Sequence, residues 1–324
     1  MPKAVRLHHY GGPEALSVEE LDPGPPGPAE VQIRHTAIGL NYIDVYDRTG
    51  LYPLELPAVL GREAAGVVTA VGRKVRGFRP GQRVAYVHAV PGAYSELRNL
   101  PAERVVHVPA AISDREAAAL MLKGLTAQYL LRQTHRVARG ETLLVHAAAG
   151  GVGLLLCQWA KALGAIVIGV VGSEAKAELA RKNGCRHVLI SGREELVPAV
   201  RKLTRGAGVA VVYDSVGKDT FLESLDCLRP RGMMVSYGNA SGPPPAVSPL
   251  ELSKRGSLYL TRPTLFSYIA TRQELEAAAR ELFSMVKRRK VRVRIGQTYP
   301  LIEAAQAHRD LEARLTTGST VLIP

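Results

Sequence analysis

The sequence predicts an α/β protein of two domains, a mostly β first domain followed by a domain built on a parallel sheet. The chain has 324 residues, which is too long for one ordinary compact domain. From Lys3 to about Val108 it consists of short strand-like segments divided by Gly and Pro. From about Leu120 strands and helices alternate, and this alternation predicts a parallel sheet covered by helices on both faces.

The individual elements follow from hydrophobic periodicity and from turn residues. In the first domain, residues 31–34, 65–71 and 83–87 are typical strands. In the second, strands are predicted at 142–147, 165–171, 188–190, 209–213 and 233–237, and helices at 152–163, 174–182, 194–203 and 221–228. A proline-rich loop over 241–249 precedes a strand at 257–260, helices at 272–286 and 301–311, and a last strand at 320–323.

Composition narrows the class of protein. Hydrophobic residues make up 46% and charged residues 22%, without an apolar run of about 18 residues, so an ordinary transmembrane helix is excluded. The first residues lead directly into a strand pattern without the features of a signal peptide, which predicts a cytoplasmic protein. Cys157, Cys185 and Cys227 have no metal-ligand spacing and are expected to be buried free thiols.

The net charge of +13 favours polyanionic partners. However, the basic residues are dispersed, and only 5% of residues are aromatic. We interpret the densest basic run, residues 287–290, as a solvated helix end rather than a nucleic-acid patch. Nucleic-acid binding is therefore not expected, although the charge leaves it as an alternative.

The segment from His146 to Gly153 is an A-x-G-x-x-G variant of the dinucleotide fingerprint, lying between a strand and an amphipathic helix. Ala148 replaces the first glycine, Gly150 lets the backbone approach a pyrophosphate, and Gly153 lets the helix pack close to the strand. The helix N-terminus then offers N–H groups and partial positive charge to the phosphates. His146 itself is interpreted as a satisfied residue at a strand end. The contacts expected from the turn are Ala149, Gly150, Gly151, Val152 and Gly153.

The next strand end indicates which dinucleotide binds. An NAD-specific protein usually places Asp or Glu about 20 residues past the fingerprint, but this chain has Gly172 and Ser173 there. These small residues leave room for a 2′-phosphate, and Lys176 supplies a cation. Glu174 is a contrary signal because its carboxylate is able to bind a ribose hydroxyl. We predict NADPH as the cofactor, with Lys176 as a merely solvated helix residue as the alternative.

Several further motifs resemble those of one known family. They are residues 11–14 (Gly-Gly-Pro-Glu), 41–46 (Asn-Tyr-Ile-Asp-Val-Tyr), 48–52 (Arg-Thr-Gly-Leu-Tyr), 123–127 (Lys-Gly-Leu-Thr-Ala), 146–153, 213–217 (Tyr-Asp-Ser-Val-Gly) and 261–263 (Thr-Arg-Pro). Together they resemble the zinc-independent quinone oxidoreductases and zeta-crystallins of the medium-chain dehydrogenase/reductase superfamily, the bacterial members in particular. The resemblance extends over essentially the whole chain.

The resemblance implies a GroES-like catalytic domain over 1–122, a Rossmann NADPH-binding domain over 123–262, and a C-terminal segment, 263–324, that returns to the first domain. It also implies a cofactor in the cleft between the domains and a homodimer. The cofactor contacts that it implies are Asn41, Thr126, Tyr129, Gly172, Ser173, Lys176, Ser191, Ser215, Tyr237, Gly238, Arg262 and Arg314. In one departure, Ser191 stands where the family often has a tyrosine packed by the adenosine phosphate. Arg193 is a possible electrostatic substitute.

The expected catalytic residues are Asn41, Tyr46 and Tyr52. Taken singly, each residue is as typical of a turn or of core packing as of a binding site. Their grouping favours a wall of the cofactor or substrate site. Zinc-dependent members of the superfamily ligate metal with a cysteine and a Gly-His-Glu segment, whereas this chain has Arg62 between Gly61 and Glu63 and no cysteine before residue 157. We therefore expect no metal.

A small planar quinone fits these residues as substrate, because its carbonyls are already electrophilic and need alignment and protons more than a Lewis acid. We expect hydride or single-electron transfer, with water or Tyr46 as the source of the proton. One alternative is an NADPH-dependent enone or alkene reductase. Another is an NADPH-binding protein with an RNA-binding role, whose affinity would fall steeply with salt.

Overall fold

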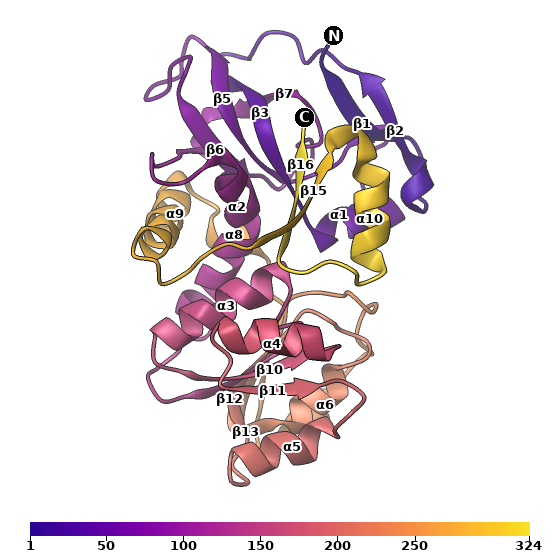
Figure 1. Ribbon diagram of the computed structural model, residues 1–324, viewed down its shortest axis with the longest axis vertical. Helices are drawn as coiled ribbons and strands as arrows, with labels where there is room; N and C mark the ends of the chain where they lie inside the picture. Colours follow the sequence, from indigo (N-terminus) through magenta and orange to yellow (C-terminus); the bar gives the residue numbers. More distant parts are fainter. The chain divides into compact units, whose positions relative to one another are not determined.

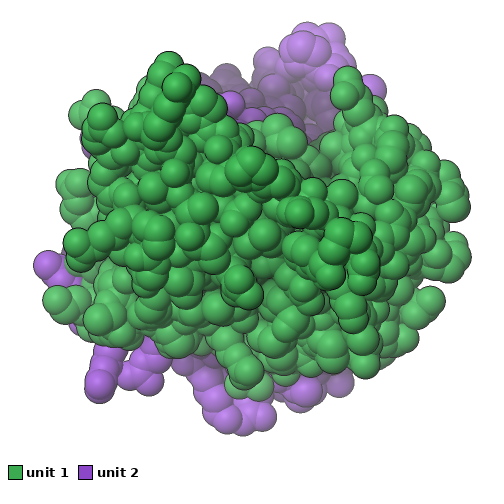
Figure 2. All heavy atoms as spheres, turned by 90° about the horizontal axis from the view of Figure 1, so that it is seen from above, with its two compact units in different colours: residues 1–125, 269–287, 293–324 green, residues 126–268, 288–292 purple.

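The computed structural model describes residues 1–324, which form two compact units (Figure 1). Unit 1 comprises residues 1–125, 269–287 and 293–324, and unit 2 comprises residues 126–268 and 288–292 (Figure 2). The chain thus passes between units at 125/126, 268/269, 287/288 and 292/293. The domain borders drawn from the sequence are 122 and 262. No helix is both long and apolar enough to span a membrane.

Unit 1 is built on a seven-stranded sheet in which β15, β16, β3, β5, β6 and β8 are neighbours in that order and β7 also pairs with β3. Its strands are β3 (Glu30–Leu40), β5 (Glu63–Val71), β6 (Arg83–Val87), β7 (Leu97–Pro101), β8 (Val105–His107), β15 (Ile295–Pro300) and β16 (Ser319–Ile323). A small sheet joins β1 (Lys3–Leu7), β2 (Leu16–Glu20) and β4 (Ala58–Val59). The last strand, β16, pairs antiparallel with residues 38–40 of β3.

Helices of unit 1 position its candidate site residues. They are α1 (Tyr42–Thr49), α9 (Arg272–Lys287), α10 (Ala304–Glu312) and the first part of α2 (Asp114–Tyr129), with short 3-10 turns at 13–15, 102–104 and 301–303. The sequence analysis did not predict α1, α2 or β15. Helix α1 begins at a capping box between Asn41 and Asp44 and ends at Gly50, which has a left-handed φ of 79°.

Unit 2 is built on a six-stranded parallel sheet in the order β11, β10, β9, β12, β13, β14. Strands β10, β11, β12 and β13 are labelled in Figure 1. The strands are β9 (Thr142–Val145), β10 (Ile166–Val171), β11 (His187–Ile190), β12 (Val209–Asp214), β13 (Leu228–Ser236) and β14 (Tyr259–Thr261). The helices are α3 (Gly151–Ala162), α4 (Glu174–Lys182), α5 (Leu196–Leu203), α6 (Phe221–Asp226), α7 (Pro249–Lys254) and α8 (Leu265–Tyr268), with a π-helical turn over 130–134. The mixed α/β fold predicted from the sequence is confirmed.

The order of these strands positions a binding site. From β9 the chain proceeds outward to β10 and β11, and then returns to the other side of β9 with β12, β13 and β14. In parallel sheets of this kind, ligands bind at the carboxyl ends of the strands where the order reverses, which is here between β9 and β12. The three cysteines are buried free thiols, as predicted, with Sγ of Cys185 lying 3.4 Å from Sγ of Cys157.

Candidate cofactor and substrate sites

The glycine-rich turn lies at this reversal point. Strand β9 ends at Val145 and helix α3 begins at Gly151, with Gly150 as its N-cap. No side chain caps the helix, and its first intrahelical bond runs from the amide of Leu154 to the carbonyl of Gly150. The preceding N–H groups of the first turn have no partner within a helix, so they are suited to bind phosphate oxygens.

Steric constraints explain the glycine at position 153. A Cβ atom there would lie 2.3 Å from the carbonyl oxygen of Ala147 and 2.8 Å from the Cα atom of Ala148, which are both backbone atoms. Ala147 itself has a positive φ of 49°, which is uncommon for a residue with a side chain. The turn therefore brings helix α3 against the end of β9 more closely than any other residue at position 153 allows, in agreement with the role inferred from the sequence.

Most other predicted cofactor contacts follow the carboxyl ends of the same sheet. Gly172, Ser173 and Lys176 follow β10, Ser191 follows β11, Ser215 follows β12, Tyr237 and Gly238 follow β13, and Arg262 follows β14. Parallel strands end at one edge, so unit 2 brings these residues to one side of its sheet. A Cβ atom at Gly238 would lie 2.6 Å from the carbonyl oxygen of Ser215, so the loops after β12 and β13 are in close contact there.

The residues after β10 fit a 2′-phosphate. A Cβ atom at Gly172 would have no heavy atom within 4 Å, and the hydroxyl of Ser173 caps helix α4 by accepting from the amide of Lys176 at 3.4 Å. The carboxylate of Glu174 pairs with Arg181 at 3.2 Å and with Arg193 at 3.0 Å. Glu174, whose carboxylate was the argument for a ribose hydroxyl and against NADPH, thus pairs with two guanidinium groups. One of them belongs to Arg193, which was suggested to compensate for Ser191.

Thr126 and Tyr129 lie in the part of α2 that belongs to unit 2, and both are buried. The ring of Tyr129 stacks on that of Tyr268, with centroids 4.4 Å apart and an angle of 13° between the planes. Burial raises the pKa of the Tyr129 hydroxyl and that of the Tyr237 hydroxyl. Both phenols are therefore neutral in the physiological range.

Only one of the two ring nitrogens of His146 has a hydrogen-bond partner, which corrects the expectation from the sequence that this side chain is satisfied. Its Nε2 atom lies 2.9 Å from Oγ of Ser224, whose hydroxyl donates to Asp214 at 3.2 Å. Because that hydroxyl donates to the carboxylate, it accepts from Nε2–H, and the proton of the neutral ring is therefore on Nε2. Nδ1 is buried without a partner, and burial lowers the pKa of the ring.

In unit 1, the three residues expected to be catalytic lie in or next to helix α1. Asn41 is the N-cap of α1, Tyr46 lies in the same helix, and the amide of Tyr52 donates to the carbonyl of Tyr46 at 3.2 Å. The Tyr46 and Tyr52 rings meet edge to face, with centroids 5.3 Å apart. Tyr42, which the sequence analysis did not single out, contacts Tyr46 with ring centroids 5.5 Å apart.

Arg314 is an exposed residue of unit 1 beyond helix α10. It has a positive φ of 59°, so the chain turns sharply there. Burial raises the pKa of the Tyr42 hydroxyl, the charge of Glu312 adds to this, and the charge of Arg314 opposes it. The charge of Arg314 is therefore close enough to act on Tyr42.

A buried ion pair adjoins Asn41. The Glu63 carboxylate is fully buried, and its Oε1 accepts from Nζ of Lys123 and from Nδ2 of Asn41, each at 2.8 Å. Its Oε2 accepts from the amide of Leu122 at 2.6 Å. The sequence analysis assigned no role to Lys123, although a lysine among the apolar residues of 120–125 is itself a signal, since a charge on such a helix needs a partner.

Arg62, at the position of a zinc-ligating histidine in related enzymes, binds the buried carboxylate of Asp47 with both branches of its guanidinium. Nε lies 2.8 Å from Oδ2 and Nη2 lies 2.7 Å from Oδ1. A paired guanidinium is no metal ligand. The chain also contains no group of three or more His, Cys, Asp or Glu side chains arranged to hold a metal ion.

A second buried network joins α1 to α10. Oδ2 of Asp44 accepts from the amide of Asn41 at 2.8 Å and from the hydroxyl of Tyr94 at 3.0 Å, whereas its Oδ1 is buried without a partner. The Tyr94 oxygen also lies 3.0 Å from Nε2 of His308, whose Nδ1 lies 3.1 Å from Arg48. Burial, with the charge of Asp47, raises the pKa of Asp44 to about 7.

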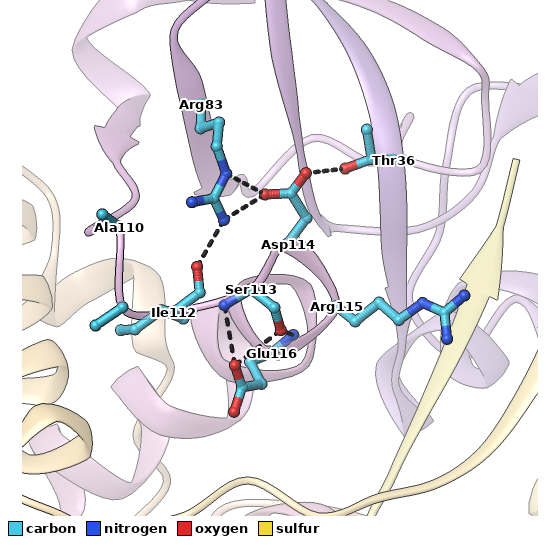
Figure 3. A pocket seen from close by; sticks show the side chains of 9 residues that line it. Thr36, Arg83, Ala110, Ile112, Ser113, Asp114, Arg115 and Glu116 are labelled. Carbon is cyan, nitrogen blue, oxygen red and sulfur yellow. Dashed lines mark hydrogen bonds and ion pairs between the residues drawn. The ribbon is translucent and has the colours of Figure 1, made fainter.

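Unit 1 also has a hollow of about 690 Å³ at the start of α2, lined by Thr36, Arg83 and residues 110–116 (Figure 3). Its charges are largely engaged with one another. Asp114 binds Arg83 and accepts from the hydroxyl of Thr36, and Glu116 caps the helix through Ser113. None of the predicted site residues lines this hollow, so we do not include it in the candidate site.

Comparisons with known proteins agree with this arrangement. Residues 27–110 match the family described as "Alcohol dehydrogenase GroES-like domain", and residues 151–284 match the family described as "Zinc-binding dehydrogenase". The chain is 54% identical to a quinone oxidoreductase of Pseudomonas aeruginosa and 48% identical to a 2-haloacrylate reductase of a Burkholderia species. The first comparison covers all of both chains, and the second covers 100% of this chain and 99% of its relative.

A solved structure of Escherichia coli quinone oxidoreductase complexed with NADPH superimposes with a TM-score of 0.98 at 49% identity, covering 99% of this chain and 100% of the other. Both the sequence and the fold thus match quinone oxidoreductases from end to end. The chain therefore belongs to the quinone oxidoreductase family of the medium-chain dehydrogenase/reductase superfamily.

Proposed function

We propose that this protein is an NADPH:quinone oxidoreductase, which reduces small planar quinones by hydride or electron transfer. The observation that carries the proposal is the glycine-rich turn at the reversal point of the unit 2 sheet, followed at the next strand end by Gly172, Ser173 and Lys176. The chain shares about half of its residues, over its full length, with named quinone oxidoreductases. One of these has been solved with NADPH, which supports both the cofactor and the substrate.

The residues of unit 2 suit NADPH. The uncapped first turn of α3 binds the pyrophosphate, and Gly150 keeps a side chain away from it. Gly153 lets the helix pack closely against the turn, and the residues after β10 take the 2′-phosphate. The charge of Lys176 favours the extra phosphate of NADPH over the bare ribose of NADH. Bound NADPH supplies the reducing equivalents as a hydride or as electrons.

The aromatic group of unit 1 provides the acceptor wall. The rings of Tyr46 and Tyr52 present apolar surface to a planar quinone, and Asn41 offers a polar group beside them. The quinone then needs alignment and a proton, and we assign the proton to water or to the Tyr46 hydroxyl. The location of the cofactor between the domains, and the homodimer, remain expectations of the family resemblance.

Steady-state oxidation of NADPH with 1,4-benzoquinone and 1,4-naphthoquinone tests the proposal. We expect turnover with both quinones and a much lower KM for NADPH than for NADH. The Lys176→Ala variant should lose most of this discrimination while keeping its affinity for NADH. An absence of NADPH oxidation across a series of quinones, by protein that binds NADPH, would refute the assignment.

A second activity is favoured by one specific finding, the 48% identity over the full chain to a 2-haloacrylate reductase. In this case the hydride goes to the carbon–carbon double bond of an activated alkene instead of to a quinone. Incubating the protein and NADPH with 2-chloroacrylate and, separately, with benzoquinone distinguishes the two. Product analysis by NMR would show a saturated acid if the alkene is the substrate and hydroquinone if the quinone is.

A further inference from the structure

We propose that Lys123 and Asn41 together bind the substrate oxygen that becomes negatively charged on reduction, and that Glu63 positions both donors. The inference rests on the proposed quinone reduction and assigns catalytic contact to Lys123, a residue to which no role was assigned from the sequence. Lys123 and Asn41 donate to the same carboxylate oxygen of Glu63, and all three side chains are at least nine-tenths buried.

Lys123 has unused donor capacity. A lysine ammonium carries three N–H donors. Only 5% of Lys123 is exposed, and its hydrogen-bond partner is Glu63 alone, at 2.8 Å. A buried ammonium whose other two donors lack acceptors is costly, and an oxygen acceptor on a ligand removes that cost. The ion pair itself neutralises the net charge, so the site accepts a neutral carbonyl before reduction as well as a charged oxygen after it.

The carboxylate of Glu63 fixes the orientation of Asn41. An ionised carboxylate only accepts hydrogen bonds, so the group of Asn41 that faces it must be the NH₂. The other acceptor near this NH₂ is the carbonyl of Gly39, at a long 3.4 Å. The second N–H of Asn41 therefore has little competition for a ligand oxygen.

The two donors are close enough to share one oxygen. Each nitrogen lies 2.8 Å from Oε1 of Glu63, so they are at most twice that distance, 5.6 Å, apart. The two donors thus already converge on one oxygen atom, so a ligand oxygen beside Oε1 would lie near both of them. Gly39 leaves room for this carboxylate, because a Cβ atom at that position would lie only 2.2 Å from Oε1 of Glu63.

A quinone that accepts a hydride, two electrons and one proton, becomes the hydroquinone monoanion, and one proton from water completes the hydroquinone. The negative charge develops on a quinone oxygen, where the Lys123 and Asn41 donors stabilise it without themselves losing a proton. Removing one such preorganised donor typically slows the chemical step by a factor of about 10²–10³.

The test compares Lys123→Met, Lys123→Arg and, as a matched control, Lys74→Met, which removes an exposed lysine of the same unit. Because methionine leaves the Glu63 carboxylate without its ion pair, Lys123→Met is also made together with Glu63→Gln. The affinity for NADPH is measured by titration. The rate of NADPH oxidation in a single turnover is then measured with quinones of graded electron-withdrawing strength.

We expect Lys123→Met, alone or with Glu63→Gln, to bind NADPH within about twofold of the wild type but to react about 10²-fold more slowly with the weakest acceptor. The loss should shrink as electron-withdrawing groups stabilise the oxygen on their own, so the rate should depend more steeply on the acceptor. Lys123→Arg, which keeps the charge, should recover part of the rate, and Lys74→Met should match the wild type.

Several outcomes would overturn the inference while leaving the proposed function intact. In one, the wild type is active, and the Lys123 variants fold but keep the wild-type rates and the wild-type dependence of the rate on the acceptor. Another is a large loss of NADPH affinity with an unchanged single-turnover rate, which would mean that Lys123 contacts the cofactor. If the methionine variants do not fold, Lys123→Gln, which removes the charge but keeps a polar side chain, takes their place, and a wild-type dependence of its rate on the acceptor would overturn the inference. A wild type inactive with every quinone would instead refute the proposed function.

Discussion

Replacing Asp44 by asparagine should change how the stability of this protein depends on pH. The pKa of Asp44 is raised to about 7 in the folded protein, above its ordinary value of 3.8, chiefly by burial. The folded state therefore binds this proton more tightly than the unfolded state does. The resulting stabilisation is fully present below about pH 4 and is lost as the pH rises to about 7.

The magnitude follows from the size of the pKa shift. One pKa unit corresponds to about 1.4 kcal/mol, so a shift from 3.8 to about 7 makes the charged carboxylate about 4 kcal/mol less favourable in the folded protein. Asparagine resembles the protonated acid. Its carbonyl oxygen can accept from the amide of Asn41 and the hydroxyl of Tyr94, and its NH₂ takes the place of the Oδ1–H, where the structure has no partner.

Urea unfolding of the wild type and of Asp44→Asn at several pH values from 5 to 8 measures this effect. We expect the variant to gain about 3 kcal/mol of stability relative to the wild type as the pH rises from 5 to 8, because about two pKa units of the shift lie above pH 5. Other titrating groups are common to both proteins and cancel in the difference. Asp219→Asn, which alters an exposed carboxylate, should give no such trend. A difference between Asp44→Asn and the wild type that stays constant across this range would refute the reasoning.

Substitutions at four further residues test other parts of the structure. Gly153→Ala should weaken NADPH binding by at least about tenfold in titrations, with unchanged circular dichroism, because the new Cβ atom would meet backbone 2.3 Å away. Lys176→Ala should raise the Kd for NADPH about tenfold and leave that for NADH unchanged. Arg62→Leu should lower the free energy of unfolding by about 3 kcal/mol in urea titrations, since the buried Asp47 carboxylate loses its bidentate partner. Tyr46→Ala should raise the quinone KM about fivefold in steady-state assays, whereas Tyr46→Phe keeps the ring and should not.

Unit 2 was the part of the fold most open to prediction from sequence. Its strands alternate with amphipathic helices, and helix α4 begins and ends at the residues expected for it, 174–182. Local signals sufficed for most of it because the strands contain short apolar runs and the helices have apolar faces, and α4 also begins at a recognisable cap, Ser173. The glycine-rich turn was found for the same reason, since its residues are contiguous.

Unit 1 was harder to predict because its elements depend on distant partners. Helix α1 begins Tyr-Ile-Asp-Val-Tyr, a segment rich in residues that favour strands, and its helical form depends on the capping box and on burial of Asp44 and Asp47. The pairing of Lys123 with Glu63 joins residues 60 positions apart. No local pattern reveals such a pair, although the presence of a charge on an apolar helix indicates that a partner exists.

The pairing of β16 with β3 also affects how the chain is made. Residues 38–40 emerge from the ribosome long before residues 320–322, with which they form hydrogen bonds. At about 5–20 residues per second, synthesis of the intervening 280 or so residues takes on the order of 14–56 seconds. During that time part of β3 is an unpaired strand edge, able to pair with another chain, while residues 126–268 can already fold. This protein is thus most exposed to aggregation, and most in need of a chaperone, before its last strand is translated.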